Sequence, residues 1–447
     1  MSEAYEKAVA AQSEAANPRQ TRMVSANAGS GKTRVLVDRV SRILLHGIEP
    51  EKILCLTYTK AAATEMQDRL YDKLGEWSIF GKDALKAELE KLTGTDVHQI
   101  SKARNLFAKA LETPEGLKVQ TIHAFCERVL SRFPIEAGIM PGFEPIEDAE
   151  AARLSEDVRK ELLKVAMADP DGPINHALQT LTVKMADQTL DGLFSWMSFS
   201  AEKIRRWEEA GGTQSLANYL GIELSETKQS LAQKFWAETD TETLTEAVPV
   251  LNGGLKTDQK AASRIKESLA NPDPVEAFYD YSQIYLTTKN ELRKNPVTKK
   301  TMEATQNYFS ADGDEASRVV FWLDKFNAVE VLSLTHAVYT LARPYSELYA
   351  QAKRKRRGLD FNDQILLVRD LLSRKDVSDW VKYKLDGGIE HILLDEAQDT
   401  SPEQWDILNS LSDAFIQDNP ERDPKEPRTL FAVGDEKQSI YGFQGAR

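Results

Sequence analysis

The segment Ala26-Asn27-Ala28-Gly29-Ser30-Gly31-Lys32-Thr33 decides the fold class of this chain. It follows a short apolar run, Met23 to Ala26, that predicts a β-strand. It precedes Thr33 to His46, whose apolar positions recur every three or four residues and predict an amphipathic helix. A glycine-rich turn between a strand and a helix is typical of phosphate-binding loops, although Ala26 stands where the general pattern has glycine. The segment therefore predicts an α/β fold with a nucleotide site.

The residues of this loop are suited to binding ATP and Mg²⁺. Gly29 and Gly31 allow the backbone to turn its N–H groups toward phosphate oxygens, and the helix N-terminus adds positive potential. Lys32 is expected to reach the β- and γ-phosphates, and the Thr33 hydroxyl is expected to ligate Mg²⁺. An incidental glycine-rich turn is the alternative interpretation, but the flanking strand and helix argue against it.

Thr33 alone cannot hold a magnesium ion, so the loop predicts a carboxylate at the end of another strand of the same sheet. The run from His391 to Leu394 predicts a buried strand, and Asp395 and Glu396 follow it directly. Asp395 suits the coordination of Mg²⁺, and Glu396 suits the catalytic base that polarises the attacking water. By itself an Asp-Glu pair is most often a surface dipeptide, so this prediction depends on the loop elsewhere in the chain.

The order of predicted elements indicates how the chain is divided. Apolar runs at 53–57, 117–121 and 429–433 predict further strands, and helical patterns follow the first two. Strands that alternate with helices are typical of a parallel sheet. Long helical patterns without strand signals fill residues 148–345. We therefore expect an α/β domain formed by residues 1–147 and 346–447, interrupted by a mostly α-helical insertion.

Composition excludes several classes of protein. The chain has 447 residues, of which 41% are hydrophobic and 28% charged, with a net charge of −13. These values describe a globular protein and not a disordered one. No apolar stretch approaches the roughly 20 residues needed to cross a bilayer, and the N-terminus does not resemble a secretory signal. We therefore expect a cytoplasmic protein without membrane contacts. Its two cysteines, Cys55 and Cys126, argue against a disulfide framework or a zinc site.

Three blocks in order, AGSGKT at 28–33, DEAQDTS at 395–401 and GDEKQSIYGFQGA at 434–446, resemble the UvrD/Rep-type helicases of superfamily 1. Shorter blocks at 56–66, 121–126 and 359–363 extend this likeness. The full set is most similar to the AddA group, the helicase-nuclease subunits of AddAB recombination complexes. The resemblance implies a RecA-like P-loop NTPase domain and an ATP-dependent DNA helicase or translocase, moving 3′ to 5′ in double-strand break repair and recombination.

The resemblance also implies roles for single residues. Gln438 would act in catalysis by sensing the γ-phosphate, since an amide both donates and accepts hydrogen bonds. Tyr441 and Phe443 would stack on bases of single-stranded DNA, and core packing is their alternative. Gln12 stands where the family's adenine-reading glutamine lies.

Further DNA contacts are implied at the ends of two predicted strands. Thr57, Thr59, Lys60, Thr121 and His123 would bind the DNA backbone, but each could equally be a cap or turn residue. A basic run at 353–357 either lines the path of the strand or, as we favour, forms a solvated helix face.

In this family a second RecA-like domain completes the ATP site, and AddA proteins carry a nuclease as well. Neither is expected within these 447 residues. The resemblance therefore implies the N-terminal part of a longer protein, whose partners would be single-stranded and duplex DNA and an AddB-like protein. Because an arginine from a second domain is worth about 10³ to 10⁵ in rate, the chain alone is expected to bind ATP but to hydrolyse it poorly.

Two other functions compete with the helicase motor. An ATP-binding interaction subunit without motor activity would bind a partner but show no DNA-stimulated hydrolysis. A small-molecule kinase would use the same phosphate loop but would not explain the block at 438–443.

Overall fold

In the computed structural model of this chain, the described residues are 10–27, 31–93, 100–113, 116–374, 380–381, 384–385, 389–416, 427–435 and 437. They form two compact units. Residues 1–151 and 353–447 make the first, which we call the α/β unit, and residues 152–352 make the second, the helical unit.

A five-stranded parallel sheet organises the α/β unit. Its strands are β1 (Arg22–Ser25), β2 (Ile53–Thr57), β3 (Lys118–Thr121), β6 (His391–Leu394) and β7 (Thr429–Gly434). Their order is β1-β7-β6-β2-β3, so two strands from the last sixty residues lie between β1 and β2. Both ends of the sequence therefore build one sheet, and the predicted α/β fold with a helical interruption is confirmed.

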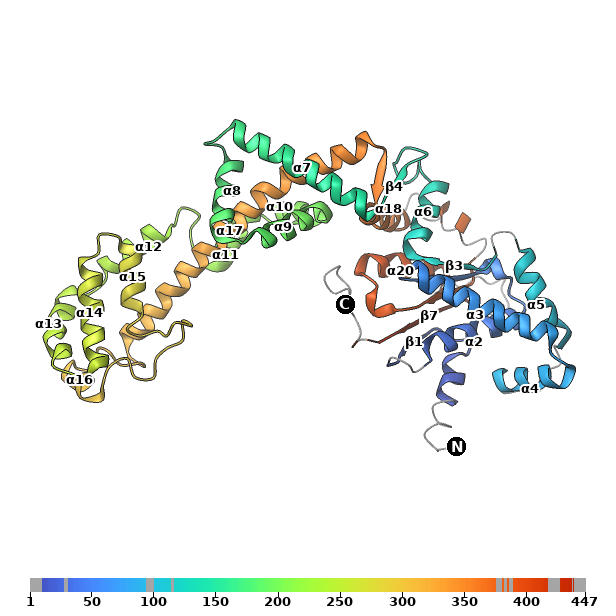
Figure 1. The fold of residues 1–447 in the computed structure, drawn as a ribbon, viewed down its shortest axis with the longest axis horizontal. Helices are drawn as coiled ribbons and strands as arrows, with labels where there is room; N and C mark the ends of the chain where they lie inside the picture. Colours follow the sequence, from blue (N-terminus) through green and yellow to red (C-terminus); the bar gives the residue numbers. More distant parts are fainter. Residues whose placement is uncertain are drawn as a thin grey trace. The chain divides into compact units, whose positions relative to one another are not determined.

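Helices cover both faces of this sheet. They are α2 (Lys32–His46), α3 (Lys60–Ile79), α4 (Lys82–Thr93), α5 (Ile100–Glu112), α6 (Ile122–Arg132), α18 (Phe361–Ser373) and α20 (Pro402–Ile416), with 3₁₀ turns η1 (Pro50–Lys52) and η2 (Ala397–Asp399). Helices α2 to α5 pack with Ile53 and Cys55 of β2, whereas α6, α18 and α20 pack with Leu54 and Leu56. Figure 1 accordingly draws α2 and α20 on opposite sides of the sheet. Alternate residues of β2 thus face two different cores, which explains its uninterrupted apolar sequence.

A second, two-stranded parallel sheet in the α/β unit joins β4 (Glu144–Ile146) to β5 (Gly358–Asp360). These strands lie close in sequence to the two junctions with the helical unit. A Cβ atom at Gly358 would lie 2.5 Å from Cδ1 of Ile146, so any larger residue there would displace this side chain. The Arg356 guanidinium also lies 3.0 Å from a Glu150 carboxylate oxygen.

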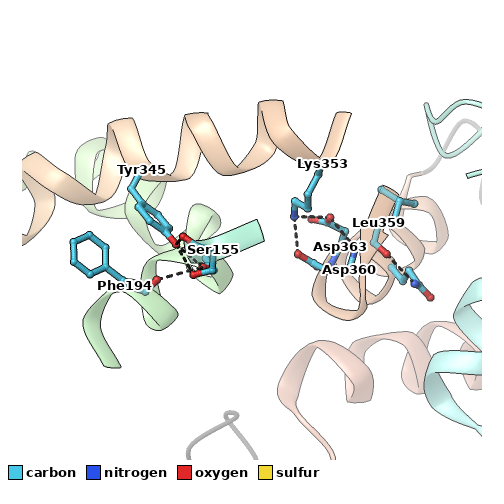
Figure 2. Close-up of polar contacts among 9 residues, drawn as sticks. Ser155, Phe194, Tyr345, Lys353, Leu359, Asp360 and Asp363 are labelled. Carbon is cyan, nitrogen blue, oxygen red and sulfur yellow. Dashed lines mark hydrogen bonds and ion pairs between the residues drawn. The ribbon is translucent and has the colours of Figure 1, made fainter. Parts of the chain in front are cut away.

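The basic run at 353–357 does not form a wholly solvated face, so that expectation is wrong for its first residue. Lys353 is 8% exposed, and its Nζ contacts carboxylate oxygens of Asp360 at 2.7 Å and Asp363 at 2.5 Å (Figure 2). Asp360 and Asp363 form the capping box at the start of α18. The lysine is buried because these paired carboxylates replace the water that it would otherwise need. Residues 354–357 are exposed, as expected.

The helices of the helical unit are α7 (Asp148–Ala168), α8 (Pro173–Lys184), α9 (Asp187–Phe199), α10 (Ala201–Glu209), α11 (Gly212–Leu220), α12 (Lys228–Ala237), α13 (Thr241–Asn252), α14 (Lys256–Ala270), α15 (Pro274–Ser282), α16 (Lys299–Ala304) and α17 (Asp314–Lys355). In the helical unit, residues of α11 to α17 pack around one large apolar cluster. Residues 148–151 of α7 and 353–355 of α17 belong to the α/β unit. Phe278 and Phe326 stack at 4.4 Å within this core, and Tyr345 shares a buried hydroxyl network with Ser155 (Figure 2). No helix in the described part of the chain is long and apolar enough to cross a membrane.

Candidate functional site

Five loops meet at one edge of the sheet because all five strands are parallel. Apart from Gln12, which precedes β1, the predicted site residues lie at or after the strand ends at Ser25, Thr57, Thr121, Leu394 and Gly434. Two backbone hydrogen bonds connect neighbouring loops where they leave the sheet. Ala26 N–H donates to Gly434 O at 2.9 Å, and Asp395 N–H donates to Leu56 O at 2.9 Å. In open α/β sheets, ligands bind beyond the carboxyl ends of the strands, which is where these residues lie.

The phosphate loop leads directly into α2. Gly31 has φ of 86°, in the left-handed region that favours glycine, and it precedes Lys32, the first residue of the helix. Residues 28–30 of the loop lie outside the described residues. Thr33 is half-buried, and no described residue forms a hydrogen bond with its hydroxyl.

Lys32 and Glu396 form an ion pair across the sheet edge. Lys32 Nζ lies 2.8 Å from Glu396 Oε2, and the side chains are 11% and 36% exposed. Glu396 has φ of 51° and ψ of 49°, a left-handed conformation that non-glycine residues rarely adopt and that is concentrated at functional sites. The backbone therefore turns this carboxylate toward the phosphate loop at a conformational cost.

The two carboxyl groups after β6 have opposite pKa shifts. Burial, with the neighbouring Glu396 charge, raises the pKa of Asp395 to about 6. Burial also raises the pKa of Glu396, but hydrogen bonds from Gln398 and Lys32 and the charge of Lys32 outweigh it, so this pKa is lowered overall. Asp395 is thus a buried carboxyl group whose ionised form a cation would favour.

Thr33 and Asp395 fit a magnesium ion by their chemistry. A hydroxyl and a carboxylate are the oxygen ligands that Mg²⁺ prefers, and this ion usually takes its remaining ligands from substrate phosphates and water. The described residues contain no group of three or more His, Cys, Asp or Glu side chains that could hold a metal by themselves.

Gln398 was not predicted from the sequence, yet it connects two loops of the site. Its amide nitrogen donates to Glu396 Oε2 at 2.7 Å, and its amide oxygen accepts from Asp435 N–H at 2.8 Å. Gly434 makes room for this bridge, since a Cβ atom there would lie 2.7 Å from the amide oxygen of Gln398. The signal available in the sequence was its place in the block DEAQDTS at 395–401, two residues after Glu396. Gln398 thus links the proposed base to the segment that leads to Gln438.

The residues expected to contact DNA occupy the ends of β2 and β3. Thr59 and Thr121 accept hydrogen bonds from Ala62 N–H and Ala124 N–H, both at 3.1 Å, and so cap α3 and α6. This geometry favours the cap alternative for both hydroxyls. Lys60 is exposed.

Two other members of this group are less accessible. Thr57 is fully buried and its hydroxyl donates to Thr59 O at 3.0 Å, so its side chain shapes the loop and does not face solvent. The His123 ring packs against Phe361 with ring centroids 4.8 Å apart, and burial lowers its pKa. Gln438, Tyr441 and Phe443 lie outside the described residues, and their roles stay predictions.

Comparison with known proteins agrees with this geometry. The family model described as UvrD/REP helicase N-terminal domain matches residues 8–447. The chain belongs to the UvrD/REP helicase family. The RecA-like character predicted for its α/β unit is that of this family's N-terminal domain.

Several relatives of this UvrD/REP chain are named as the A subunit of an ATP-dependent helicase/nuclease. The protein from Lactiplantibacillus plantarum is 26% identical over 94% of this chain and 34% of its own length. Those from Lactobacillus helveticus and Anoxybacillus flavithermus are 27% and 26% identical, each over 95% of this chain and 35% of their own length. The chain therefore spans about a third of the length of these relatives.

Proposed function

We propose that this chain binds ATP·Mg²⁺ at the carboxyl edge of its sheet and forms the nucleotide-binding half of a DNA helicase motor. The observation that carries the proposal is the Lys32–Glu396 pair, since it places a phosphate-loop lysine against a carboxylate from a different strand. A phosphate-binding cation beside a base is what phosphoryl transfer to water requires.

In this proposal each described residue has a separate task. The N–H groups at the start of α2 and the Lys32 ammonium bind phosphate oxygens. Thr33 and Asp395 hold Mg²⁺, which would neutralise charge on the β- and γ-phosphates. Glu396, freed from Lys32, accepts the proton of the attacking water, and the Gln398 amide keeps its carboxylate in place. The Gln12 amide, which lies beside Gly31 of the phosphate loop, would contact the nucleoside part of ATP.

DNA binding is proposed at the same edge of the sheet, through the exposed Lys60 and through Gln438, Tyr441 and Phe443. The side chains of Thr57, Thr59, Thr121 and His123 are engaged within the protein, so these residues would contribute main-chain contacts. Contacts of this kind bind the backbone and stack on bases without reading sequence. The support is that β2, which ends just before Lys60, pairs with β6 and with β3, together with family membership.

The activity of the longer protein is a further part of the proposal. The relatives are named as one subunit of a helicase/nuclease, which implies assembly with another protein. We propose an AddA-like role in repair and recombination, with 3′ to 5′ movement on DNA, an AddB-like partner and a cytoplasmic location. We also propose that the present chain hydrolyses ATP slowly without further residues to complete its site.

Replacing Glu396 with glutamine is expected to tighten ATP·Mg²⁺ binding about two- to fivefold, because a partly exposed ion pair is worth at most about 1 kcal/mol and ATP must displace it from Lys32. Hydrolysis should be lost at the same time, because an amide cannot accept the proton. Isothermal titration measures the first effect, and steady-state hydrolysis with and without single-stranded DNA measures the second. The exposed Glu127→Gln change is the matched control.

Either part of this experiment can contradict the proposal. Weaker ATP binding by the Glu396→Gln variant would mean that the carboxylate helps to hold the nucleotide and does not compete for Lys32. Unchanged hydrolysis would exclude Glu396 as the base. Strong DNA-stimulated turnover by the unmodified chain would overturn the expectation of slow hydrolysis, whereas ATP binding with no response to DNA would favour the alternative in which the chain is an interaction subunit.

A further inference from the structure

Two arginines of α2 are buried without contacting a carboxylate. Arg39 is 0% exposed and Arg42 is 8% exposed, and among the described residues neither forms an ion pair. Burial, together with the charges of Arg22 and Arg42, lowers the pKa of Arg39 to about 9. Burial also lowers the pKa of Arg42, although the charge of Asp38 opposes this shift. Because apolar residues of similar size would usually fill such spaces at less cost, the arginines need an explanation beyond packing.

Most of their partners are main-chain carbonyls of one N-terminal segment. The Arg39 guanidinium donates to the carbonyl oxygens of Ala15, Asn17 and Gln20 at 3.4, 2.5 and 2.7 Å. Arg42 donates to the carbonyl and the hydroxyl of Ser13 at 2.7 and 2.8 Å. A planar guanidinium with five donors can hold several carbonyls at once, which a lysine cannot. Segment 13–20 is thus bound to α2 by two guanidinium groups.

The same guanidinium groups also contact the rest of the α/β unit. Arg39 donates to Thr429 Oγ1 at 2.9 Å and lies 4.6 Å from the centre of the Phe431 ring, and both residues belong to β7. Arg42 donates to the carbonyl of Leu92 in α4. Since β7 is the strand beside β1, Arg39 fixes the N-terminal segment relative to a strand that ends at the site.

The N-terminal end of segment 13–20 lies beside the phosphate loop. Gln12 directly precedes Ser13, and its amide nitrogen lies 3.2 Å from where a Cβ atom of Gly31 would be. Arg39 lies seven residues after Lys32 on α2, a rise of about 10 Å along the helix axis. One helix therefore carries the phosphate loop at its start and holds the Gln12 segment through its middle, so the distance between the two is set by a rigid element.

We propose that Arg39 and Arg42 are positioning residues that hold Gln12 against the phosphate loop, where its amide would serve the nucleoside-reading role that the family resemblance implies. This inference rests on the proposed nucleotide binding. An amide both donates and accepts hydrogen bonds and can therefore recognise a base or a ribose, whereas the loop binds only phosphates. Arg39 and Arg42 therefore affect the affinity for ATP only through the contact of Gln12 with its nucleoside part, and not through its phosphates.

The test compares two ligands that share their phosphates. ATP·Mg²⁺ contacts the loop and the Gln12 segment, and tripolyphosphate·Mg²⁺ contacts the loop only. We expect Arg39→Lys, Arg42→Lys and Gln12→Ala each to weaken ATP binding about five- to tenfold, the usual effect of one lost hydrogen bond, with tripolyphosphate binding unchanged. Isothermal titration gives both affinities. Arg104→Lys is the control, because this exposed arginine also donates to a carbonyl, that of Phe80.

Hydrogen exchange of residues 10–20 provides a second readout that does not depend on ligand. Both lysine variants should exchange faster in this segment while α20 is unchanged. Arg39 is more deeply buried than Arg42, so the Arg39→Lys variant can fail to fold. In that case the Arg42→Lys variant alone tests the inference. Equal losses of ATP and tripolyphosphate binding, or no loss of either, would overturn the inference. Failure of the unmodified chain to bind both ligands would instead overturn the proposed function.

Discussion

Replacing Lys32 with alanine is expected to weaken ATP·Mg²⁺ binding about a hundredfold. The variant loses a charge-assisted hydrogen bond to phosphate, which is worth about 1.5 to 3 kcal/mol. It also leaves the Glu396 carboxylate without the ammonium that lies 2.8 Å away, so a negative charge faces the incoming phosphates. Isothermal titration against ATP·Mg²⁺ measures the loss, and far-UV circular dichroism checks that the sheet is retained.

A double variant separates the two causes. Adding Glu396→Gln to Lys32→Ala removes the unpaired carboxylate, so part of the lost affinity should return, and the two changes should not be additive. Lys82→Ala, at an exposed position at the start of α4, is the matched control and should bind as the unmodified chain does. Binding by Lys32→Ala within a factor of about three of the unmodified chain, far short of the loss expected for a charge-assisted hydrogen bond, would exclude the phosphate role of this lysine.

Replacing Lys353 with methionine is expected to lower the free energy of unfolding of the α/β unit by about 3 to 5 kcal/mol, since removing one partner from a buried ion pair leaves the others unpaired. Asp360 is 2% exposed, and burial together with the Asp360 charge already raises the pKa of Asp363. Without the lysine these two carboxyl groups repel each other at the capping box of α18. Urea unfolding followed by hydrogen exchange of α18 measures the change.

The same charge run provides the control for this prediction. Lys355→Met removes the same charge two residues later, at an exposed position, and should change stability by no more than about 0.5 kcal/mol. Adding Asp360→Asn to Lys353→Met should recover part of the loss, because asparagine still caps the helix but carries no charge. Equal stability of the two methionine variants would show that the Lys353 pair contributes nothing to the unit.

The ion pair between Lys32 and Glu396 suggests how nucleotide binding is communicated. ATP must separate the pair, and Gln398 connects Glu396 to Asp435 N–H at 2.8 Å. If ATP binds as proposed, a displacement of Glu396 would therefore reach the end of β7 through the Gln398 amide.

Local patterns in the sequence were sufficient for the elements that form the sheet. The runs Ile53–Thr57 and His391–Leu394 coincide with β2 and β6 because both strands are buried on two faces and so are apolar throughout. The start of α2 was equally clear, since a glycine with positive φ directly precedes the helix. Asp395 and Glu396 could be placed at the end of β6 because they directly follow an apolar run, whereas their proposed roles depend on the loop elsewhere in the chain.

Partners distant in sequence could not be predicted from such patterns. Lys32 and Glu396 are 364 positions apart, and only the order β1-β7-β6-β2-β3 brings their loops to one edge. In sequence Arg39 and Lys353 look like solvated positions of amphipathic helices, yet both are buried. Periodicity identifies which face of a helix is apolar, but a charged residue is buried only where another segment supplies acceptors, and that depends on the tertiary structure.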